Sequence, residues 1–511
     1  MLKNLAKLHS AELEGIHAKL IEVEVDLNVG LHAFNIVGLG DKAVNEAKER
    51  VNSALKNSGI KPPTRENRKI TVNLAPADVK KAGSQYDLAI ALGYLLATGQ
   101  MKDFDTDGKV FVGELALDGR LRPISGALNI AQMIEGEGFT ELYLPPENAA
   151  EAAAIRDIKI IPIHDLREAI DVLEGVKAAE PASFKPQKSR VSSAPDFSEI
   201  KGQENAKRAL MIAAAGGHNL LMIGPPGVGK SLLAQALVGI LPELAMDEAI
   251  EITKIYSAVG LSSGGLLSQR PFRSPHHSAS AVAIIGGGQN PRPGEISLAH
   301  RGILFLDELP EFQKNVLEGL RQPLEAGLVH VARARGSVVF PAKFTLIAAM
   351  NPCPCGYYGD PEKECRCSAY EVIKYQKKIS GPLLDRIDLQ IRVPRVALEE
   401  LRIKRAADEA SPRARKRIET TRDIQARRLS KLSGKKIRTN SEMSSRQTEE
   451  LTNLTAEASR FIDTLDRAHL SPRGYYRLLK TARTIADLEE SEKVGPEHLA
   501  EAFSYRLREE V

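Results

Sequence analysis

The feature that most constrains this chain is the segment LLMIGPPGVGKSL at residues 220–232. An apolar run typical of a buried strand leads into eight residues that match the phosphate-loop pattern G-x-x-x-x-G-K-[ST] at every position, and a helical run follows. In such a loop, glycines let backbone N–H groups approach phosphate oxygens, and the helix N-terminus adds partial positive charge. A chance match within a glycine-rich turn is the alternative. The predicted phosphate-binding residues are Gly224, Pro225, Pro226, Gly227, Val228, Gly229, Lys230 and Ser231.

A second apolar run, GILFLDE at residues 302–308, ends in two acidic residues. In a parallel sheet this strand would be buried on both faces, with its carboxylates emerging beside the phosphate loop. We expect Lys230 to reach the β and γ phosphates of ATP, and Ser231 and Asp307 to hold Mg²⁺. Glu308 would orient and polarise the attacking water. The sequence therefore predicts an ATPase that uses ATP and Mg²⁺.

Length and composition set broad limits. A chain of 511 residues is too long for one hydrophobic core and predicts three or four domains. The net charge of only +4 does not by itself indicate nucleic acid. No apolar run approaches 18 residues and no signal-peptide pattern opens the chain, so we expect a cytoplasmic protein with no membrane segment. The absence of Trp argues against extended base-stacking platforms.

Residues 1–175 alternate strand-like and helical runs, which predicts an α/β domain. The clearest helix is expected at residues 41–57, with Asp41 as N-cap, Gly59 as stop signal and one apolar face. That face is formed by Val44, Ala47, Val51 and Leu55. Strands are expected at residues 20–25, 69–73, 110–113, 141–144 and 159–161.

Three segments of this region carry a family resemblance: HAFNIVGLGDKAVNEAKERVNSAL, KITVNLAPADVKKAGSQYDLAIALGYL and VGELALDGRLRPISGALNIA. They resemble the amino-terminal domain of the magnesium-chelatase-related ComM/YifB family, whose fold is similar to ribosomal protein S5 and to the proteolytic domain of Lon. The Pro-, Ser- and Lys-rich residues 176–196 then predict a linker.

The resemblance to Lon raises the question of proteolysis. On that alignment the serine position falls near Gln85 and Tyr86, with Ser84 one step early, and the position of the base falls near Leu128. A serine without a nearby base has no means of activation. We therefore expect this domain to be proteolytically inactive, with a structural or nucleic-acid-binding role.

Residues 197–395 resemble the core of AAA+ ATPases, beginning with DFSEIKGQ ahead of a helix. The strand-like run LIAAMNP places Asn351 where this family has sensor 1, a polar residue that bonds the γ phosphate or the water. The alternative is a surface Asn before a turn. In GPLLDRID, which resembles minichromosome maintenance helicases and magnesium chelatases, Arg386 matches the arginine that reaches a neighbouring subunit's ATP. An ion pair to Asp385 or Asp388 is the alternative.

Residues 396–511 resemble the carboxy-terminal helical lid of the same families. In LSPRGYYRLLKTARTIADL, Arg473 stands at the sensor 2 position and would contact the γ phosphate. Leu478, Leu479, Ala482 and Ile485 fall on one helix face, which predicts a small helical bundle.

Two insertions point beyond ATP hydrolysis. Residues 271–288 resemble the helix-2 insert of this AAA+ branch, and residues 327–340 resemble the hairpin before sensor 1. In related helicases both project into a central channel. Arg333 and Arg335 at the hairpin tip would grip DNA phosphates, although a solvated hairpin is the alternative. The adjacent His276 and His277 suggest zinc, but no third ligand is evident.

The four cysteines, Cys353, Cys355, Cys365 and Cys367, all fall within the insertion at residues 353–367. Four thiolates suffice for a structural zinc ion, although one-residue spacing is unusual and reduced thiols without metal are the alternative. Residues 401–440 carry 14 Lys or Arg against 4 Asp or Glu. This excess predicts either a duplex-facing surface or a solvated helical face.

The resemblance covers nearly the whole chain and identifies it as a member of the ComM/YifB group of magnesium-chelatase-like AAA+ proteins. It implies a homo-hexameric helicase that encircles DNA and drives branch migration when DNA is integrated in natural transformation. Two alternatives are a chelatase motor that helps insert Mg²⁺ into a porphyrin and a Lon-like protein-remodelling ATPase. The expected architecture is a Lon-like α/β domain, a P-loop α/β domain and a helical lid.

Overall fold

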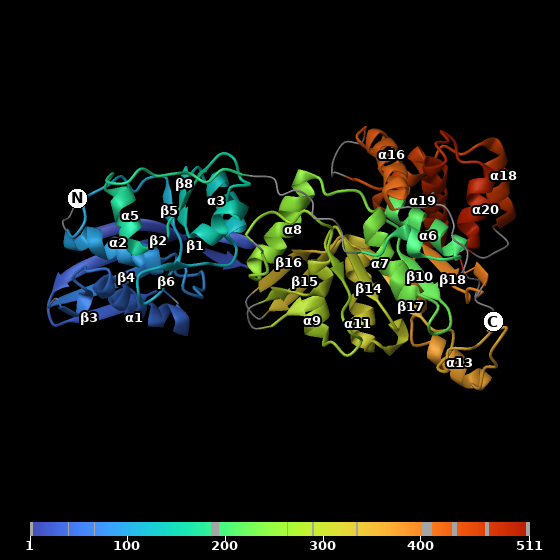
Figure 1. The fold of residues 1–511 in the computed structure, drawn as a ribbon, viewed down its shortest axis with the longest axis horizontal. Helices are drawn as coiled ribbons and strands as arrows, with labels where there is room; N and C mark the ends of the chain where they lie inside the picture. The colour runs from blue at the N-terminus through green and yellow to red at the C-terminus, as the bar shows by residue number, and fades with distance from the viewer. Residues whose placement is uncertain are drawn as a thin grey trace. The chain divides into compact units, whose positions relative to one another are not determined.

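The computed structural model describes residues 4–38, 40–65, 67–184, 194–262, 264–288, 291–333, 336–397, 399–400, 411–431, 437–465 and 470–506. The chain divides into two compact units. The first comprises Met1–Ser189 and Ala245–Ser268, and the second comprises Arg190–Leu244 and Gln269–Val511. Both contain sheets with packed helices, which confirms the α/β expectation (Figure 1).

The first unit is built on a four-stranded sheet with the order β1 (Leu5–Glu14), β2 (His17–Val29), β4 (Arg68–Ala75) and β3 (Ala33–Val37). The pairs β1–β2 and β2–β4 are antiparallel, and β3 runs parallel to β4. The apolar helix α2 (Asp87–Thr98) is almost entirely buried and packs on β1 and β2. The remaining elements of this unit before residue 189 are α1 (Lys42–Asn57), η1 (Pro63–Arg65), β5 (Lys109–Phe111), β6 (Glu114–Leu115), β7 (Leu121–Arg122), α3 (Ala127–Gly136), β8 (Glu141–Leu144), α4 (Pro146–Ala152), β9 (Lys159–Pro162) and α5 (Leu166–Leu173).

Helix α1 forms where the apolar spacing predicts it. The Asp41 side chain accepts a hydrogen bond from the Val44 backbone N–H at 3.0 Å, and Gly59 adopts a left-handed φ of 77° just beyond the helix. The predicted face is buried throughout, with its four side chains at most 1% exposed. Capping and periodicity together were therefore sufficient to define this helix.

Helix α8 (Met246–Ala258) belongs to the first unit, although it follows the phosphate-loop helix in sequence. The Ser257 carbonyl accepts a hydrogen bond from the Gly126 N–H at 2.9 Å, and the Ser257 hydroxyl donates to Glu151 at 3.0 Å. Burial of Ile252 and Ile255 completes the contact with α3. No local signal in the sequence indicated this packing.

The second unit contains a five-stranded parallel sheet with the order β11 (Phe272–Arg273), β14 (Ile303–Leu306), β17 (Thr345–Met350), β10 (Leu220–Ile223) and β18 (Leu389–Arg392). The strands β10 and β17 are central and are buried almost completely. Because all five run in one direction, their carboxyl ends meet at one edge, where ligands of open α/β sheets bind. The other elements before residue 393 are η2 (Phe197–Glu199), α6 (Glu204–Gly216), α7 (Lys230–Ile240), α9 (Ala281–Ile285), β12 (Gly286–Gly287), β13 (Arg292–Pro293), α10 (Glu295–Leu298), η3 (Leu309–Glu311), α11 (Lys314–Gly319), α12 (Arg321–Ala326), β15 (Leu328–Arg333), β16 (Gly336–Pro341), α13 (Ala369–Gln376) and α14 (Gly381–Leu384).

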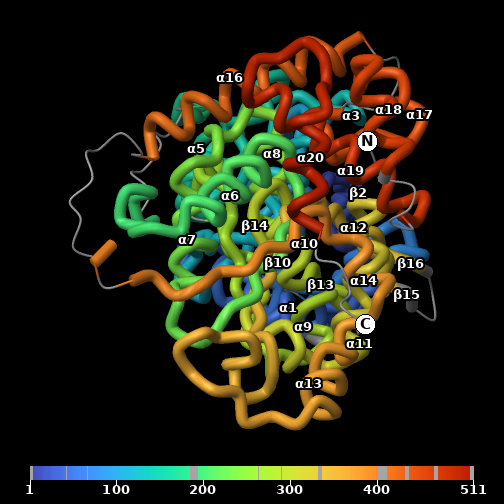
Figure 2. Tube along the Cα trace, turned by 90° about the vertical axis from the view of Figure 1, so that its right-hand side faces the viewer, coloured from blue at the N-terminus to red at the C-terminus, as the bar shows by residue number. Residues whose placement is uncertain are grey.

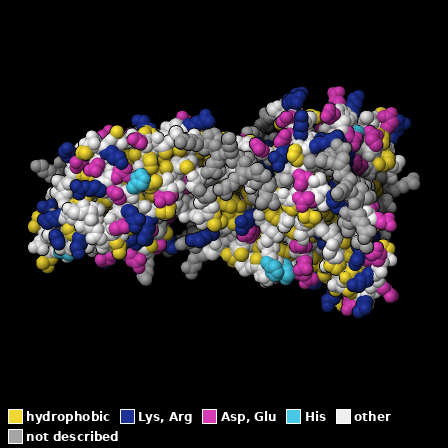
Figure 3. All heavy atoms as spheres, in the orientation of Figure 1, with side chains coloured by type: hydrophobic (Ala, Val, Ile, Leu, Met, Phe, Trp, Pro, Cys, Tyr) yellow, Lys and Arg dark blue, Asp and Glu magenta, His cyan; other side chains and the backbone are white. Residues whose placement is uncertain are grey.

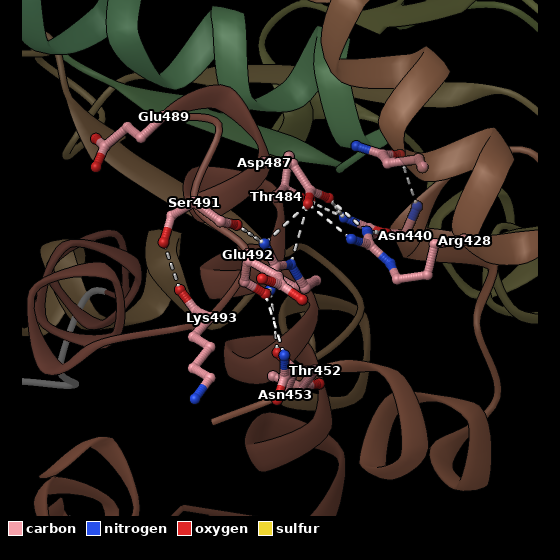
Figure 4. A network of polar contacts seen from close by, with 12 residues as sticks. Arg428, Asn440, Thr452, Asn453, Thr484, Asp487, Glu489, Ser491, Glu492 and Lys493 are labelled. Atoms are coloured by element: carbon pink, nitrogen blue, oxygen red, sulfur yellow. Dashed lines mark hydrogen bonds and ion pairs between the residues drawn. The ribbon is translucent and has the colours of Figure 1, made fainter. Parts of the chain in front are cut away.

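The carboxy-terminal part of the second unit is helical, as expected for the lid. A buried polar network joins its helices around Asp487, which accepts hydrogen bonds from Arg428 and Asn440 (Figure 4). Asp487 also accepts a hydrogen bond from Arg483. Because Asp487 is 1% exposed, loss of either Arg428 or Arg483 would leave its buried charge only partly compensated. The elements of this part are α16 (Ser411–Leu429), η5 (Asn440–Glu442), α17 (Ser445–Leu451), α18 (Ala456–Leu465), α19 (Pro472–Leu488) and α20 (Pro496–Ser504).

The surface offers few simple clues to a partner. On the face drawn in Figure 3, basic and acidic side chains are interspersed, without a dominant patch of one sign. Among the helices that the structure describes, none has the length and apolarity needed to cross a bilayer.

Candidate functional site

The phosphate loop connects β10 to α7, as the sequence predicts. Gly227 and Gly229 adopt left-handed φ values of 80° and 89°, which side-chain-bearing residues rarely take. A Cβ on Gly224 would lie 2.3 Å from the Val393 carbonyl oxygen, so the close approach of these two backbones requires glycine here. The backbone conformation of this loop therefore depends on its three glycines.

Lys230 begins α7 and turns back into the loop. Its Nζ donates to the carbonyl oxygens of Gly224 and Pro225 at 2.7 and 2.9 Å, and to Asn351 Oδ1 at 3.1 Å. Burial lowers the pKa of the Lys230 ammonium from its usual range, while Asp307 and Glu308 act in the opposite direction. The structure therefore brings together the predicted phosphate-binding lysine and the predicted sensor 1 residue.

The predicted magnesium ligands also meet. Asp307 follows β14 directly, and the Ser231 hydroxyl donates to its Oδ2 at 2.9 Å. A hydroxyl and a carboxylate are oxygen donors of the kind that Mg²⁺ prefers, and the cation would be completed by phosphate oxygens and water. The donor set at this edge of the sheet therefore fits ATP with Mg²⁺.

Glu308 adopts an unusual backbone conformation beside these groups, with a φ of 51° that is uncommon for a non-glycine residue. Its carboxylate lies 3.3 Å from Nδ1 of His277, a residue of the segment that leads into α9. Strained backbone of this kind concentrates at functional sites. Sequence reasoning considered His277 only as a possible metal ligand and missed its contact with Glu308.

Arg386 and Arg473 converge on one carboxylate. Arg386 Nη2 lies 2.5 Å from Glu325 Oε2, and Arg473 Nη2 lies 2.9 Å from Glu325 Oε1. The hydrogen bond from Arg386 holds the pKa of Glu325 below its usual range. Arg386 thus makes an ion pair within its own chain, as the alternative interpretation allowed, but with Glu325 rather than with Asp385 or Asp388. No motif pointed to Glu325.

The predicted hairpin before sensor 1 is present as β15 and β16, which pair antiparallel from Leu328–Pro341 to Arg333–Gly336. Arg335 lies outside the described residues, and so does the side chain of Arg333. The predicted insert at residues 271–288 contains β11, α9 and β12. The phosphate contacts expected of the two arginines stay a prediction.

The four cysteines form a compact cluster in which all four Sγ atoms lie within 4.8 Å of one another. The Sγ of Cys353 lies 3.4 Å from that of Cys355 and 3.7 Å from that of Cys365, and Cys355 and Cys365 are separated by 3.6 Å. A tetrahedral zinc site with Zn–S distances of about 2.3 Å places its sulfurs about 3.8 Å apart. The cluster therefore suits a metal ion such as zinc. In the described part of the chain no other group of this kind occurs, so His276 and His277 are not part of one.

Several arginines of α16 donate hydrogen bonds to backbone carbonyls of neighbouring helices. Arg415 donates to the carbonyl oxygen of Gly239, Arg417 to Leu488 and Arg422 to Ala214. These carbonyls lie in the last turns of α7, α19 and α6, where a cation also meets the negative end of the helix dipole. These hydrogen bonds give Arg415, Arg417 and Arg422 a structural role, and the duplex-facing surface stays a prediction. Residues 401–410, Lys435 and Lys436 lie outside the described part of the chain.

Ser84 in the first unit donates a hydrogen bond to the Glu114 carboxylate. Leu128, at the position where the resemblance to Lon would need a base, is completely buried in α3. A carboxylate acceptor can orient a hydroxyl, but the apolar Leu128 cannot take its proton. The absence of proteolysis stays a prediction.

Comparison with known families covers most of the chain. Residues 23–148 match the family described as subunit ChlI of Mg-chelatase, and residues 196–401 match magnesium chelatase, subunit ChlI. Residues 408–506 match the ChlI C-terminal family.

Two bacterial relatives match over nearly the full length, and a magnesium-chelatase subunit matches over part of it. The chain is 43% identical over 505 residues to the uncharacterized protein YifB of Salmonella typhimurium, covering 98% of this chain and 97% of that protein. It is 42% identical over 509 residues to the competence protein ComM of Haemophilus influenzae, with the same two coverages. The magnesium-chelatase 38 kDa subunit of Rhodobacter capsulatus is 27% identical over 362 residues, which cover 64% of this chain and 92% of that protein.

Proposed function

This chain belongs to the ComM/YifB family of magnesium-chelatase-like AAA+ proteins, and we propose that it is an ATP-driven motor that forms a ring around DNA. Its task would be branch migration during the integration of DNA in natural transformation, in the cytoplasm. The observation that carries the ATPase is the meeting of Lys230, Asn351, Ser231 and Asp307 at one edge of the parallel sheet. The competence protein among the relatives supports a task in DNA uptake or integration.

Each residue of the site would have its own role in ATP hydrolysis. When bound, ATP with Mg²⁺ supplies the γ-phosphoryl group and the cation that neutralises its developing charge. Lys230 and the loop N–H groups bind phosphate oxygens, and Ser231 and Asp307 hold the cation. Glu308 orients and polarises the attacking water, and Asn351 fixes the same water or the γ phosphate.

Arg386 would complete the ATP site of a neighbouring subunit, and Arg473 would contact the γ phosphate as sensor 2. Both guanidinium groups form ion pairs with the carboxylate of Glu325 within one chain. In a ring, phosphate oxygens would bind these guanidinium groups in place of that carboxylate. We therefore propose a homo-hexamer whose ATP sites lie between subunits. A metal-insertion motor is the alternative, which the chelatase relative supports over only 64% of this chain.

DNA should stimulate the ATPase. We expect single-stranded or branched DNA to raise the turnover rate several-fold, and porphyrin or unfolded protein to have no effect. Increasing the salt concentration from about 50 to about 200 mM should weaken DNA binding steeply, because phosphate contacts release counterions. The measurement is steady-state ATP hydrolysis with each ligand in turn.

A matched pair of variants tests the hairpin. Arg333→Ala combined with Arg335→Ala should weaken DNA binding and reduce the salt dependence. Arg446→Ala removes an exposed arginine that pairs with Glu450 in α17 and should change neither DNA binding nor its salt dependence.

In the stimulation experiment, a rise in ATP turnover with porphyrin instead of DNA would contradict the proposal and favour the metal-insertion motor.

The four cysteines should hold one zinc ion per chain. Elemental analysis of freshly purified protein should give about one equivalent of zinc, because four thiolates within 4.8 Å of one another can supply all four ligands of one tetrahedral ion. Cys365→Ser should lower the zinc content sharply. Metal-free wild-type protein would show that the cysteines are simply reduced thiols.

A further inference from the structure

The turn that carries Cys353 and Cys355 lies close against the phosphate loop, at Gly356. Cys353 and Cys355 follow Asn351 at the end of β17, and a turn is closed by a 3.0 Å hydrogen bond from the Gly356 N–H to the Cys353 carbonyl. Gly356 has a left-handed φ of 87°. A Cβ at this position would lie 2.7 Å from Cδ of Pro226 in the phosphate loop and 3.9 Å from Cγ of Asn351.

Backbone groups around the cluster support the sulfurs. The Tyr358 N–H donates to Cys353 Sγ at 3.3 Å, and the Cys355 N–H donates to Cys367 Sγ at 3.4 Å. Such N–H donors stabilise metal-bound thiolates and fix the ligands in place. The turn that carries Gly356 is therefore shaped by the same residues that would bind the metal.

The cysteine-containing insertion, which follows β17 on one side of β10, also contacts the chain just after β18 on the other side of β10. Arg395, just beyond β18, donates to Asp360 Oδ2 at 3.0 Å and lies over the ring of Tyr357 at 5.6 Å. Gln376 at the end of α13 donates to the Pro352 carbonyl oxygen at 3.1 Å. Because β17 and β18 are the two neighbours of β10, the insertion connects the strands on either side of the phosphate loop. Figures 1 and 2 show the segment around α13 projecting from the second unit beside this part of the sheet.

We propose that zinc bound by the four cysteines sets the affinity of the ATP site by holding Gly356 against Pro226. With the metal in place, the turn at residues 353–356 presses on the phosphate loop from the side of Asn351 and keeps both in the nucleotide-binding arrangement. Loss of zinc releases the turn and weakens nucleotide binding. This inference rests on the proposed ATPase and adds a metal-dependent control to the same site.

Two glycines of the insertion allow a matched test. Gly356 and Gly359 both have left-handed backbones, with φ values of 87° and 74°, so an alanine at either meets similar backbone strain. Only Gly356 has a neighbour for the new methyl group, because no heavy atom lies within 4 Å of a Cβ on Gly359. In the full chain, Gly356→Ala should keep its zinc but raise the Kd for a fluorescent ATP analogue about tenfold, the effect of a local steric conflict. Gly359→Ala should keep both its zinc and a Kd close to that of the wild type.

Removal of the metal provides the second measurement. Cys365→Ser and chelator-treated wild-type protein should both lose zinc and bind the analogue at least as weakly as Gly356→Ala, with thermal unfolding confirming that each remains folded. Equal analogue affinity in zinc-loaded and zinc-free folded protein would overturn the inference while leaving the ATPase intact. So would equal affinity in the two glycine variants. A wild-type protein that binds zinc but no nucleotide would overturn both proposals.

Discussion

Replacing Glu308 with glutamine is expected to lower ATP turnover by about a thousandfold while leaving nucleotide affinity within a few-fold of the wild type. The amide keeps the size of the side chain but cannot polarise the attacking water, and loss of a general base typically costs about 10² to 10⁴ in rate. Lys230, Ser231 and Asp307 remain to bind ATP with Mg²⁺. Steady-state turnover and equilibrium binding of an ATP analogue separate the two effects.

The matched control is Glu311→Gln. This residue lies one turn further along in η3 and pairs with Lys378 at 3.1 Å, with its carboxylate away from Ser231 and Asp307 in the described contacts. It should leave turnover nearly unchanged because the pair is partly exposed and contributes little. If Glu308→Gln hydrolysed ATP at the wild-type rate, another group would have to activate the water and the assignment of Glu308 would be wrong.

Local sequence signals predicted the parts of this chain whose structure depends on neighbouring residues. The phosphate loop, the strand that Asp307 follows and the helix that begins at Lys42 all carry their turn, cap or periodic residues within a short segment. Strand β1 (Leu5–Glu14) was not predicted, because its Leu, Ala, Lys and Glu residues favour a helix in isolation. Its ten-residue ladder with β2 overrides that preference.

Contacts between distant residues limited the prediction of the site. His277 and Glu308 are brought together only because β11 lies beside β14, and Glu325 meets Arg473 across 148 positions of sequence. The arginines of α16 show the same limit, because their count gives no information about which helix ends they contact. Residue type and spacing therefore identified the chemistry of the site, whereas the partners that hold its charged groups required the tertiary structure.

Arg386→Ala is expected to lower turnover by about a thousandfold or more, the effect of losing a guanidinium that stabilises charge on the transferred phosphoryl group. Arg386→Lys should rescue little, because an ammonium lacks the planar pair of donors that binds two oxygens at once. Nucleotide binding to an isolated chain should persist, since in one chain Arg386 contacts Glu325 and Pro382 rather than the phosphate loop. Arg446→Ala, at an exposed arginine, should retain wild-type turnover.

Mixing two inactive variants tests whether Arg386 acts between subunits. Lys230→Ala removes the phosphate-binding lysine and Arg386→Ala removes the guanidinium, so each homogeneous ring lacks an essential group at every site. In a mixed ring, an interface that joins an intact phosphate loop from one chain to an intact Arg386 from another contains both groups, and a fraction of the wild-type turnover should return. For this to happen Arg386 must leave Glu325 when a neighbour's phosphates compete for it, because one guanidinium cannot satisfy both. Mixed rings with no activity would mean that Arg386 acts through its own Glu325, as a structural ion pair within the chain.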